Sequence, residues 1–367
     1  MGYLRSKTSA NADQIRPPVI SVGVIGWARA NLFNGWFNSV LTLIVLYLLW
    51  LTVPPLVRWA FINSHWLPGN VACKSEGGGA CWSVITSNIR FILFGFYPYN
   101  LQWRPLLAII MLVCLLVYSQ NRKHWKKLLF WAWILGLVSM GVLLKGGILG
   151  LESVESNDWG GLPLTLLLSV FGLTAAYPVG IALALGRQSR MPIVKSFCVV
   201  YIELIRGVPL ISLLFMSSVV FPLFLPEGIT VNKILRAQVA IILFTAAYIA
   251  EVVRGGLQGM NRGQYEAAES LGLNYFQTMR LIILPQALKI VIPPSVSILI
   301  SAFKDTSLVV IIALYDLLKT AQTTLSDPRW MGYSAEMYIF VALIYFVCCF
   351  FMSNYSRRLE KELDTSL

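Results

Sequence analysis

Long apolar runs recur along this chain, and short polar segments separate them. A helix that crosses the hydrocarbon core of a bilayer needs about 20 predominantly apolar residues, and several of the runs reach that length. Only 13% of the 367 residues are charged, whereas soluble domains carry about 25%. Because so few charges cannot cover a soluble surface, the sequence predicts an all-α polytopic membrane protein.

Basic residues mark one side of the predicted membrane domain. The formal net charge is +12, and the lysines and arginines fall in short clusters between apolar runs. Cytoplasmic loops of membrane proteins carry such an excess, so the pattern indicates topology and predicts no nucleic-acid partner. About eight spans place every basic cluster and both termini in the cytoplasm. The predicted spans are 37–57, 105–119, 128–144, 162–185, a span from the break at 207–209 to 225, 235–253, 282–303 and 337–352.

The first part of the chain contains a polar tail and a long loop. Residues 1–35 form the basic tail, and positions 19–36 could lie on the membrane surface as an interfacial helix. We expect Pro54 and Pro55 to end the first span. The loop that follows, over 58–104 on the outer side, is much longer than a typical connection, which favours an ordered or functional segment.

Residues 304–322 predict a partly buried helix on the outer side.

Two cysteines, Cys73 and Cys81, flank a glycine-rich turn in this outer loop. In an oxidising compartment they could close a small disulfide hairpin worth about 2–3 kcal/mol, and two unpaired thiols are the alternative. The other cysteines lie in apolar runs, where free cysteine packs as a small hydrophobic residue. No Cys, His or carboxylate spacing is typical of a metal site, so no metal is predicted.

A polar, helix-prone interval over 265–285 separates two apolar runs on the basic side. Glu266, Ala267 and Ala268 favour a helix, and Gly272 can leave helical geometry at little steric cost. The interval therefore predicts a helix–turn–helix at the membrane surface, which would dock something outside the membrane. The sequence contains no G-x-x-x-x-G-K-[ST] motif, so we expect no ATP to bind to a P-loop of this chain.

This interval resembles a known family signature. Glu266-Ala267-Ala268, three residues, Gly272, nine residues and Ile282-Ile283-Leu284-Pro285 look like the EAA loop of type I ABC importer permeases. Further segments resemble the polar amino acid branch of that family: ELIRGVPLI at 203–211, AAYIAEVVRGGLQGM at 246–260, LPQALKIVIPP at 284–294 and KDTSLV at 304–309. The resemblance covers the chain from about residue 160 to the C-terminus. The three extra spans and the long outer loop before it resemble the larger general L-amino acid permeases.

The resemblance implies a domain organisation. Residues 159–356 would form the five-helix ABC transmembrane type-1 core, with a coupling loop over 261–280. Residues 36–158 would add N-terminal spans and the periplasmic loop 58–104, and residues 357–367 would form a cytoplasmic C-terminal tail. The protein would be a multi-pass protein of a bacterial inner membrane.

The resemblance also implies a function. The chain would be the permease subunit of an ATP-driven, binding-protein-dependent amino acid importer, and not an enzyme. Its partners would be a second homologous permease subunit in a heterodimer, a pair of cytoplasmic ATPase subunits and a periplasmic amino acid binding protein. The chain itself would hold no cofactor, because ATP and Mg²⁺ would bind to the ATPase subunits. The alternatives are a self-sufficient secondary amino acid transporter, which should show inverted repeats and broken helices, and a membrane enzyme, for which no nucleophile–base pair is evident.

Two sets of site residues follow. The resemblance assigns ATPase coupling to Glu266, Ala267, Ala268 and Gly272. Ionisable groups inside membrane domains are candidates for a substrate pathway, and hydroxyl groups could bind an α-carboxylate. These candidates are Glu203, Arg206, Glu251, Arg254, Lys304, Asp305, Thr306 and Ser307. The alternatives are structural: Glu251 and Arg254 could pair at i and i+3, and Lys304 with Asp305 could mark a helix end. The transported amino acid stays open, as does whether this subunit holds a substrate site.

Overall fold

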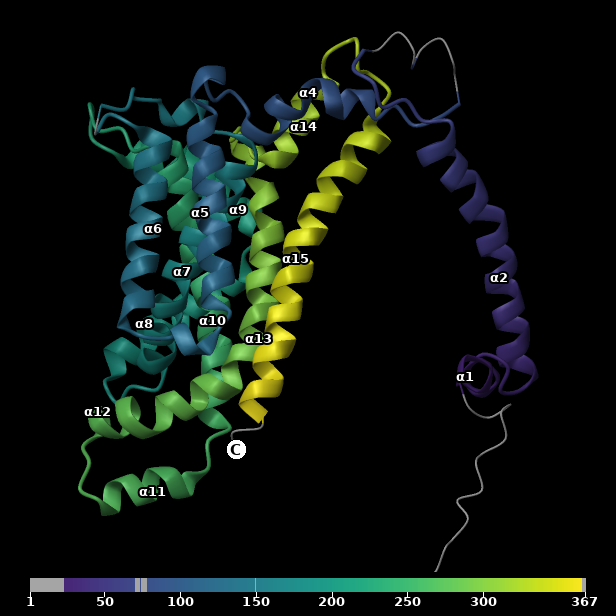
Figure 1. Ribbon diagram of the computed structural model, residues 1–367. Helices are drawn as coiled ribbons and strands as arrows, with labels where there is room; N and C mark the ends of the chain where they lie inside the picture. The colour runs from purple at the N-terminus through teal and green to yellow at the C-terminus, as the bar shows by residue number, and fades with distance from the viewer. Residues whose placement is uncertain (1–22, 70–72, 74–77, 149, 365–367) are drawn as a thin grey trace, which may run out of the picture. The chain divides into compact units, whose positions relative to one another are not determined.

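The structure is a computed structural model that describes residues 23–69, 73, 78–148 and 150–364. Every regular element in these ranges is a helix (Figure 1). Their contacts divide the chain into two units, one of Met1–His65 with Ala72–Ala80 and one of Trp66–Val71 with Cys81–Leu367. Most of the predicted N-terminal tail (1–22), part of the glycine-rich turn (74–77) and the last residues of the predicted C-terminal tail (365–367) lie outside the described residues.

The first unit contains two α-helices, α1 (Gly23–Asn31) and α2 (Trp36–Val57), among the residues that the structure describes. α2 is the helix that is long and apolar enough to span a membrane. The sequence predicted that Pro54 and Pro55 end this span, but the helix includes both and continues through a π-helical turn to Ile62. Proline removes a backbone donor from a helix. The N–H of Arg58 donates to the carbonyls of both prolines, so the helical hydrogen bonding continues past them.

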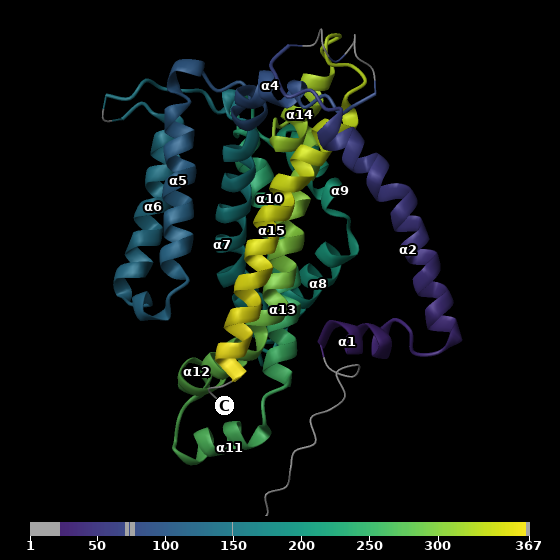
Figure 2. The same cartoon turned by 45° about the vertical axis from the view of Figure 1, so that its right-hand side comes forward.

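The second unit begins with three helices, α4 (Ser83–Phe94), α5 (Trp103–Ser119) and α6 (Lys127–Lys145). α5 and α6 pack together as an antiparallel hairpin (Figure 2). The buried Tyr97 hydroxyl donates to the carbonyl of Leu144 at 3.0 Å, and Arg104 donates to the carbonyl of Glu152 at 2.6 Å. α4 packs against α7 and α14, so the predicted loop over 58–104 is partly ordered as a helix.

The cysteines of this structure fall into two groups. Cys73 and Cys81, the candidates for a disulfide, are each disulfide-bonded. The free thiols are those of Cys114, Cys198, Cys348 and Cys349.

The remaining helices form the core of the second unit. They are α7 (Gly161–Arg187), α8 (Pro192–Gly207), α9 (Leu210–Phe215), α10 (Lys233–Gln258), α13 (Leu284–Asp305), α14 (Leu317–Leu325) and α15 (Ser334–Asp364). In the described part of the chain, seven helices can cross a membrane, or eight if α8 and the bent segment Leu210–Phe224 count as one span. The bend of 104° follows extended backbone at Val208, which is the conformation that a following proline favours. The predicted fold, about eight transmembrane helices, is confirmed.

α10 is the central helix of this unit, since it packs against α7, α8 and α13. Two buried apolar clusters surround it. One includes Leu164, Leu168, Leu214, Ile241 and Val309, and the other, which we call the lower cluster, includes Ile202, Ile249, Val253, Ile283 and Val291. Within a bilayer, van der Waals packing rather than removal from water holds helices together. The lower cluster therefore fixes α7, α8, α10 and α13 relative to one another at the end of the bundle that carries the 261–280 loop (Figure 1).

A buried carboxylate lies at the opposite end of the bundle. Asp316 is fully buried and caps α14. Its Oδ1 accepts a hydrogen bond from the N–H of Lys319 at 2.9 Å, and its Oδ2 accepts one from the N–H of Leu318 at 3.3 Å. Tyr345 of α15 lies beside it. Burial raises the pKa of Asp316 to about 6, and the two backbone donors limit the rise.

We expect Asp316 to make the folded protein less stable at pH 7 than at pH 5. Its folded pKa of about 6 exceeds the unfolded value of about 3.9. Between these values only the folded state keeps the proton, so stability falls as the pH rises from about 4 to 6, by about 3 kcal/mol in total. The Asp316→Asn variant keeps an acceptor for the helix cap but does not titrate.

The measurement is the midpoint of thermal unfolding in detergent, for wild type and Asp316→Asn, at pH 5 and pH 7. All other titrating groups are common to both proteins. As the pH rises, the unfolding midpoint of the wild type should therefore fall relative to that of the variant. A difference between the two proteins that is the same at both pH values would contradict the prediction.

Candidate functional site

The 261–280 loop consists of two short helices, as its sequence predicted. They are α11 (Arg262–Ser270) and α12 (Tyr275–Thr278). The Asn261 side chain caps α11 by accepting a hydrogen bond from the N–H of Gly263 at 2.9 Å. Asn274 and Gln277 form a capping box at the start of α12, with reciprocal bonds of 2.9 and 3.0 Å. Local side-chain caps of this kind satisfy the free N–H groups of a helix terminus, so each helix is defined by its own sequence.

The turn between these helices depends on Gly272. Its φ is +72°, in the left-handed region that favours glycine. A Cβ added here would meet nothing within 4 Å, so the backbone conformation, and not a lack of space, requires glycine. The N–H of Gly272 donates to the carbonyl of Glu269 at 2.9 Å, and the N–H of Leu273 donates to that of Ala268 at 3.1 Å. These bonds close the C-terminal end of α11.

The three residues of the EAA motif differ in exposure. Glu266 and Ala267 are exposed, whereas Ala268 is fully buried. Two apolar side chains after the motif, Leu271 and Phe276, are 75% and 68% exposed. The loop thus presents a carboxylate, a small side chain and apolar surface outward, a combination that suits a protein partner.

A continuous helical stretch connects the loop to the membrane domain. α12 passes through a π-helical turn, Met279–Ile283, directly into α13. Met279 and Ile283 are buried in the lower cluster. The side chain of Gln286 in α13 also donates to that of Gln264 in α11 at 3.1 Å. α11 is therefore linked to α13 both along the chain and through this side-chain contact.

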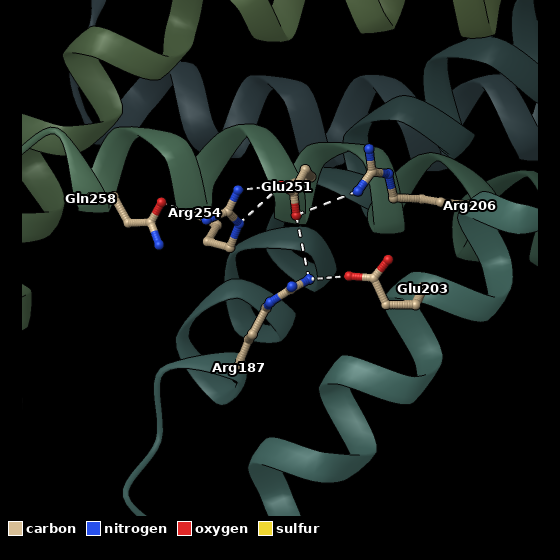
Figure 3. Close-up of polar contacts among 6 residues, drawn as sticks. All are labelled: Arg187, Glu203, Arg206, Glu251, Arg254 and Gln258. Atoms are coloured by element: carbon tan, nitrogen blue, oxygen red, sulfur yellow. Dashed lines mark hydrogen bonds and ion pairs between the residues drawn. The ribbon is translucent and has the colours of Figure 1, made fainter.

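A cluster of charged side chains lies near the C-terminal end of α10, shortly before the 261–280 loop begins, and Figure 3 shows its members. Glu251 of α10 is at its centre, and its carboxylate forms ion pairs with the guanidinium groups of three arginines. These are Arg187 of α7 at 3.4 Å, Arg206 of α8 at 3.5 Å, and Nε of Arg254, one turn along α10, at 2.9 Å. The side chain of Glu251 is 23% exposed, so partial burial strengthens these contacts relative to those of a surface pair.

Two further residues complete this charge cluster. Arg187 also pairs with Glu203 of α8 at 2.9 Å, and Arg254 donates to the side chain of Gln258. The guanidinium of Arg206 lies 5.7 Å from the ring centre of Tyr248, within reach of a cation–π contact. With three arginines and two glutamates, the cluster carries a formal charge of +1 and ties α7, α8 and α10 together.

The structure divides the eight predicted pathway residues into two sets. Glu203, Arg206, Glu251 and Arg254 meet in the charge cluster, and Glu251 with Arg254 also forms the predicted i,i+3 pair. The residues 304–307 lie at the other end of α13. α13 rises about 1.5 Å per residue, so Lys304 lies roughly 20 Å along it from Val291 of the lower cluster. The hydroxyls of Thr306 and Ser307 donate to carbonyls of their own helical turn at 2.7 and 2.8 Å.

Sequence reasoning missed Arg187 and Gln258 as members of the cluster. Arg187 follows the predicted span 162–185, and its position in the sequence indicates only the cytoplasmic side. Its contact with Glu251 joins residues that are 64 positions apart, and nothing local in the sequence indicates that pairing. Gln258 follows Arg254 by one helical turn, so i,i+4 spacing could have identified it.

Comparison with known proteins places this chain among transport proteins. The family model described as "Binding-protein-dependent transport system inner membrane component" matches residues 176–365, more than half of the chain. A model of the apolipoprotein N-acyltransferase N-terminal domain matches residues 91–221, less than half.

Full-length relatives are similar along almost the whole chain. The inner membrane amino-acid ABC transporter permease protein YhdY of Escherichia coli is 48% identical over 92% of this chain and 93% of its own length. The glutamate/glutamine/aspartate/asparagine transport system permease protein BztC of Rhodobacter capsulatus is 41% identical over 94% of this chain and 95% of its own length. A shorter relative, the probable amino-acid ABC transporter permease protein YckA of Bacillus subtilis, is 37% identical over 55% of this chain and 87% of its own length. The chain therefore belongs to the family of binding-protein-dependent transport system inner membrane components, and it is a transport permease of the polar amino acid branch.

Proposed function

We propose that this chain forms one transmembrane half of an ATP-driven, binding-protein-dependent amino acid importer. It is a multi-pass inner membrane protein, and relatives along its full length are amino acid permeases by name. In this proposal a second homologous permease supplies the other half of the path in a heterodimer. A periplasmic binding protein delivers the amino acid, and both termini lie in the cytoplasm.

The observation that carries the proposal is the attachment of α11 to α13. Glu266 and Ala267 are exposed on α11, while the continuous helical stretch from α12 to α13 is anchored in the lower cluster through Met279 and Ile283. The sequence has no P-loop, so in this proposal ATP and Mg²⁺ bind to a pair of cytoplasmic ATPase subunits. Glu266 and Ala267 then contact an ATPase subunit, Ala268 packs inside the loop, and Gly272 sets the turn. Closure of the ATPase pair would push on α11 and thereby on α13.

The two sets of polar residues would serve successive parts of the path. Glu203, Arg206, Glu251 and Arg254 offer both signs of charge near the 261–280 loop. Lys304, Asp305, Thr306 and Ser307 offer both signs of charge and two hydroxyls near the opposite end of α13. An amino acid carries an ammonium and a carboxylate, so either set has groups that match it.

We expect Glu266→Lys to lower ATP-driven uptake at least tenfold, because it reverses the exposed charge of the docking helix. The assay uses vesicles that contain the complete importer, with ATP inside or absent and the binding protein outside. Uptake is measured with radiolabelled glutamine, glutamate, leucine and lysine. Glu227→Lys is the matched control, since Glu227 is exposed in the loop before α10, at the other end of that helix from the 261–280 loop.

Two results would overturn the proposal. One is full uptake by this chain in vesicles without any ATPase subunit, which would instead support a secondary transporter. The other is equal uptake by the Glu266→Lys and Glu227→Lys proteins at equal amounts of inserted protein.

A further inference from the structure

One face of the membrane-spanning helix α13 is exposed and carries polar groups, and we call it the polar face. It consists of Pro294, Ser297, Ser301 and Lys304. These residues are spaced by three or four positions, so they lie on the same side of the helix. The other side of α13 packs into the protein, where Ser295 is buried. At about 1.5 Å per residue, the polar face extends roughly 15 Å along the helix.

Lys304 lies well inside the membrane-spanning part of the protein. The ring centre of its neighbour Phe303 is 5.3 Å from that of Tyr345 in α15. Tyr345 is in the middle of the apolar run over 337–352, so about 12 Å of helix separates it from either end of that run. This depth differs from the outer side that the sequence predicted for residues 304–322.

The ammonium of Lys304 is exposed and has no ionic partner at this depth. In the part of the chain that the structure describes, Lys304 makes no ion pair, not even with the adjacent Asp305. A charged side chain inside the membrane is costly unless it faces a partner or a water-filled space. The exposed lysine therefore indicates that lipid does not cover this part of α13.

Three further groups of the polar face lack a hydrogen-bond partner. A serine in a helix can donate to the carbonyl of the preceding turn, as Ser295 does at 2.7 Å. Among the described residues, the hydroxyls of Ser297 and Ser301 make no such bond. Pro294 has no N–H to donate to the carbonyl of Ile290. Because lipid tails offer no partner to such groups, the polar face must meet water or protein.

A cavity lies beside this face, between α13 and α15. Its volume is about 310 Å³. Its polar lining residues are Ser297 of α13 and Ser353, Ser356, Arg357 and Glu360 of α15. Arg357 and Glu360 follow the apolar run of α15, so Ser297 borders a hydrophilic space at the end of the span.

We infer that the polar face of α13 lines the path of the transported amino acid, and that Lys304 binds its α-carboxylate inside the membrane. The polar face offers an ammonium for a carboxylate, and hydroxyl and carbonyl oxygens for an amino group. Lys304 and Ser301 are roughly 4.5 Å apart along the helix axis, so one small zwitterion can contact both. The inference rests on the proposed function for the identity of the transported molecule.

The first test is the reaction of single cysteines in the complete importer, held in nanodiscs so that a reagent reaches both faces. The free thiols are replaced by alanine beforehand, at Cys114, Cys198, Cys348 and Cys349. Ser297→Cys and Ser301→Cys then probe the polar face. The matched controls are Ser295→Cys, on the buried side of α13, and Leu135→Cys, which is exposed on the apolar helix α6. The reagents are an anionic and a cationic methanethiosulfonate, which react with thiolates in water.

We expect both polar-face cysteines to react at least tenfold faster than either control, without nucleotide or with ATP and vanadate. At Ser301→Cys, the nearby Lys304 should favour the anionic reagent over the cationic one. Adding Lys304→Met should therefore lower the ratio of the anionic to the cationic rate at least threefold. Adding Lys289→Met should leave the ratio unchanged, because Lys289 is roughly 18 Å from Ser301 along α13.

Uptake by the complete importer tests the contact with the carboxylate. Lys304→Met should lower ATP-driven uptake of the radiolabelled amino acids at least tenfold, whereas Lys304→Arg, which keeps the charge, should retain most of it. Fast cysteine reaction together with unchanged uptake by Lys304→Met would overturn the carboxylate contact.

Polar-face cysteines that react no faster than the controls in either nucleotide state would overturn the whole inference. Lipid or a tightly packed second permease would then cover this face. The reaction rates do not depend on transport. A failure of the proposed function would therefore appear as absent ATP-driven uptake by the wild type, and not in these rates.

Discussion

Replacing Gly272 with proline is expected to abolish ATP-driven uptake while the protein still inserts into the membrane. Proline fixes φ near −65°, whereas Gly272 has a φ of +72°. Proline also removes the N–H that donates to the carbonyl of Glu269. The chain would then leave α11 in a different direction, and Glu266 and Ala267 would no longer be presented to the ATPase subunit. Because the turn lies outside the packed helices, we expect insertion and the packing of α10 and α13 to persist.

The measurements are uptake in vesicles, co-purification of the ATPase subunits and the amount of protein in the membrane fraction. Gly272→Asn is the matched control, because asparagine adopts the left-handed conformation more readily than most residues and keeps the N–H. The proline variant should lose both uptake and the ATPase subunits, and the asparagine variant should retain most of each. Full uptake by the proline variant would refute the coupling role of this turn.

The sequence predicted those parts of the molecule that depend on nearby residues. The two helices of the 261–280 loop carry their own caps, Asn261 and the Asn274–Gln277 box, and the left-handed turn falls on a glycine. The apolar runs predicted the long helices, because a bilayer sets their length. Local reasoning was wrong at Pro54 and Pro55, because the helix includes both residues and continues through a π-helical turn to Ile62.

Features that join distant parts of the chain were not predictable. The spacing of Glu251 and Arg254 predicted their pair, but the approach of Arg187 and Arg206 depends on how α7 and α8 pack against α10. A single sequence does not reveal contacts between residues that are far apart along the chain. The charged residues of the cluster could therefore be interpreted only as topology markers or as single candidates for the substrate pathway.

Glu251→Gln is expected to lower both the stability of the protein and its uptake, each by a large amount. The change keeps the shape of the side chain but removes the charge that three arginines share. Arg187 keeps Glu203 as a partner, whereas Arg206 and Arg254 lose the carboxylate that they contact. A hydrogen bond to a charged group contributes about 1.5–3 kcal/mol, so we expect the free energy of unfolding to fall by about 2 kcal/mol or more. Uptake should fall at least tenfold, since the charge cluster would no longer hold α7, α8 and α10 together near the 261–280 loop.

A set of variants separates a structural role of the cluster from contact with the transported amino acid. Glu203→Gln is the milder comparison, because Glu203 is 56% exposed and, among the residues that the structure describes, its ion pair is with Arg187. Glu251→Gln, Arg254→Gln and the double variant form a cycle. In the double variant the formal charge of the cluster returns to +1, so its loss of stability should be smaller than the sum of the single losses. If the cluster is structural, uptake per folded protein recovers together with stability in the double variant. If Glu251 contacts the amino acid, the stability of the double variant recovers while its uptake stays low and its KM stays high. Strictly additive losses of stability would show that Glu251 and Arg254 do not act as a pair.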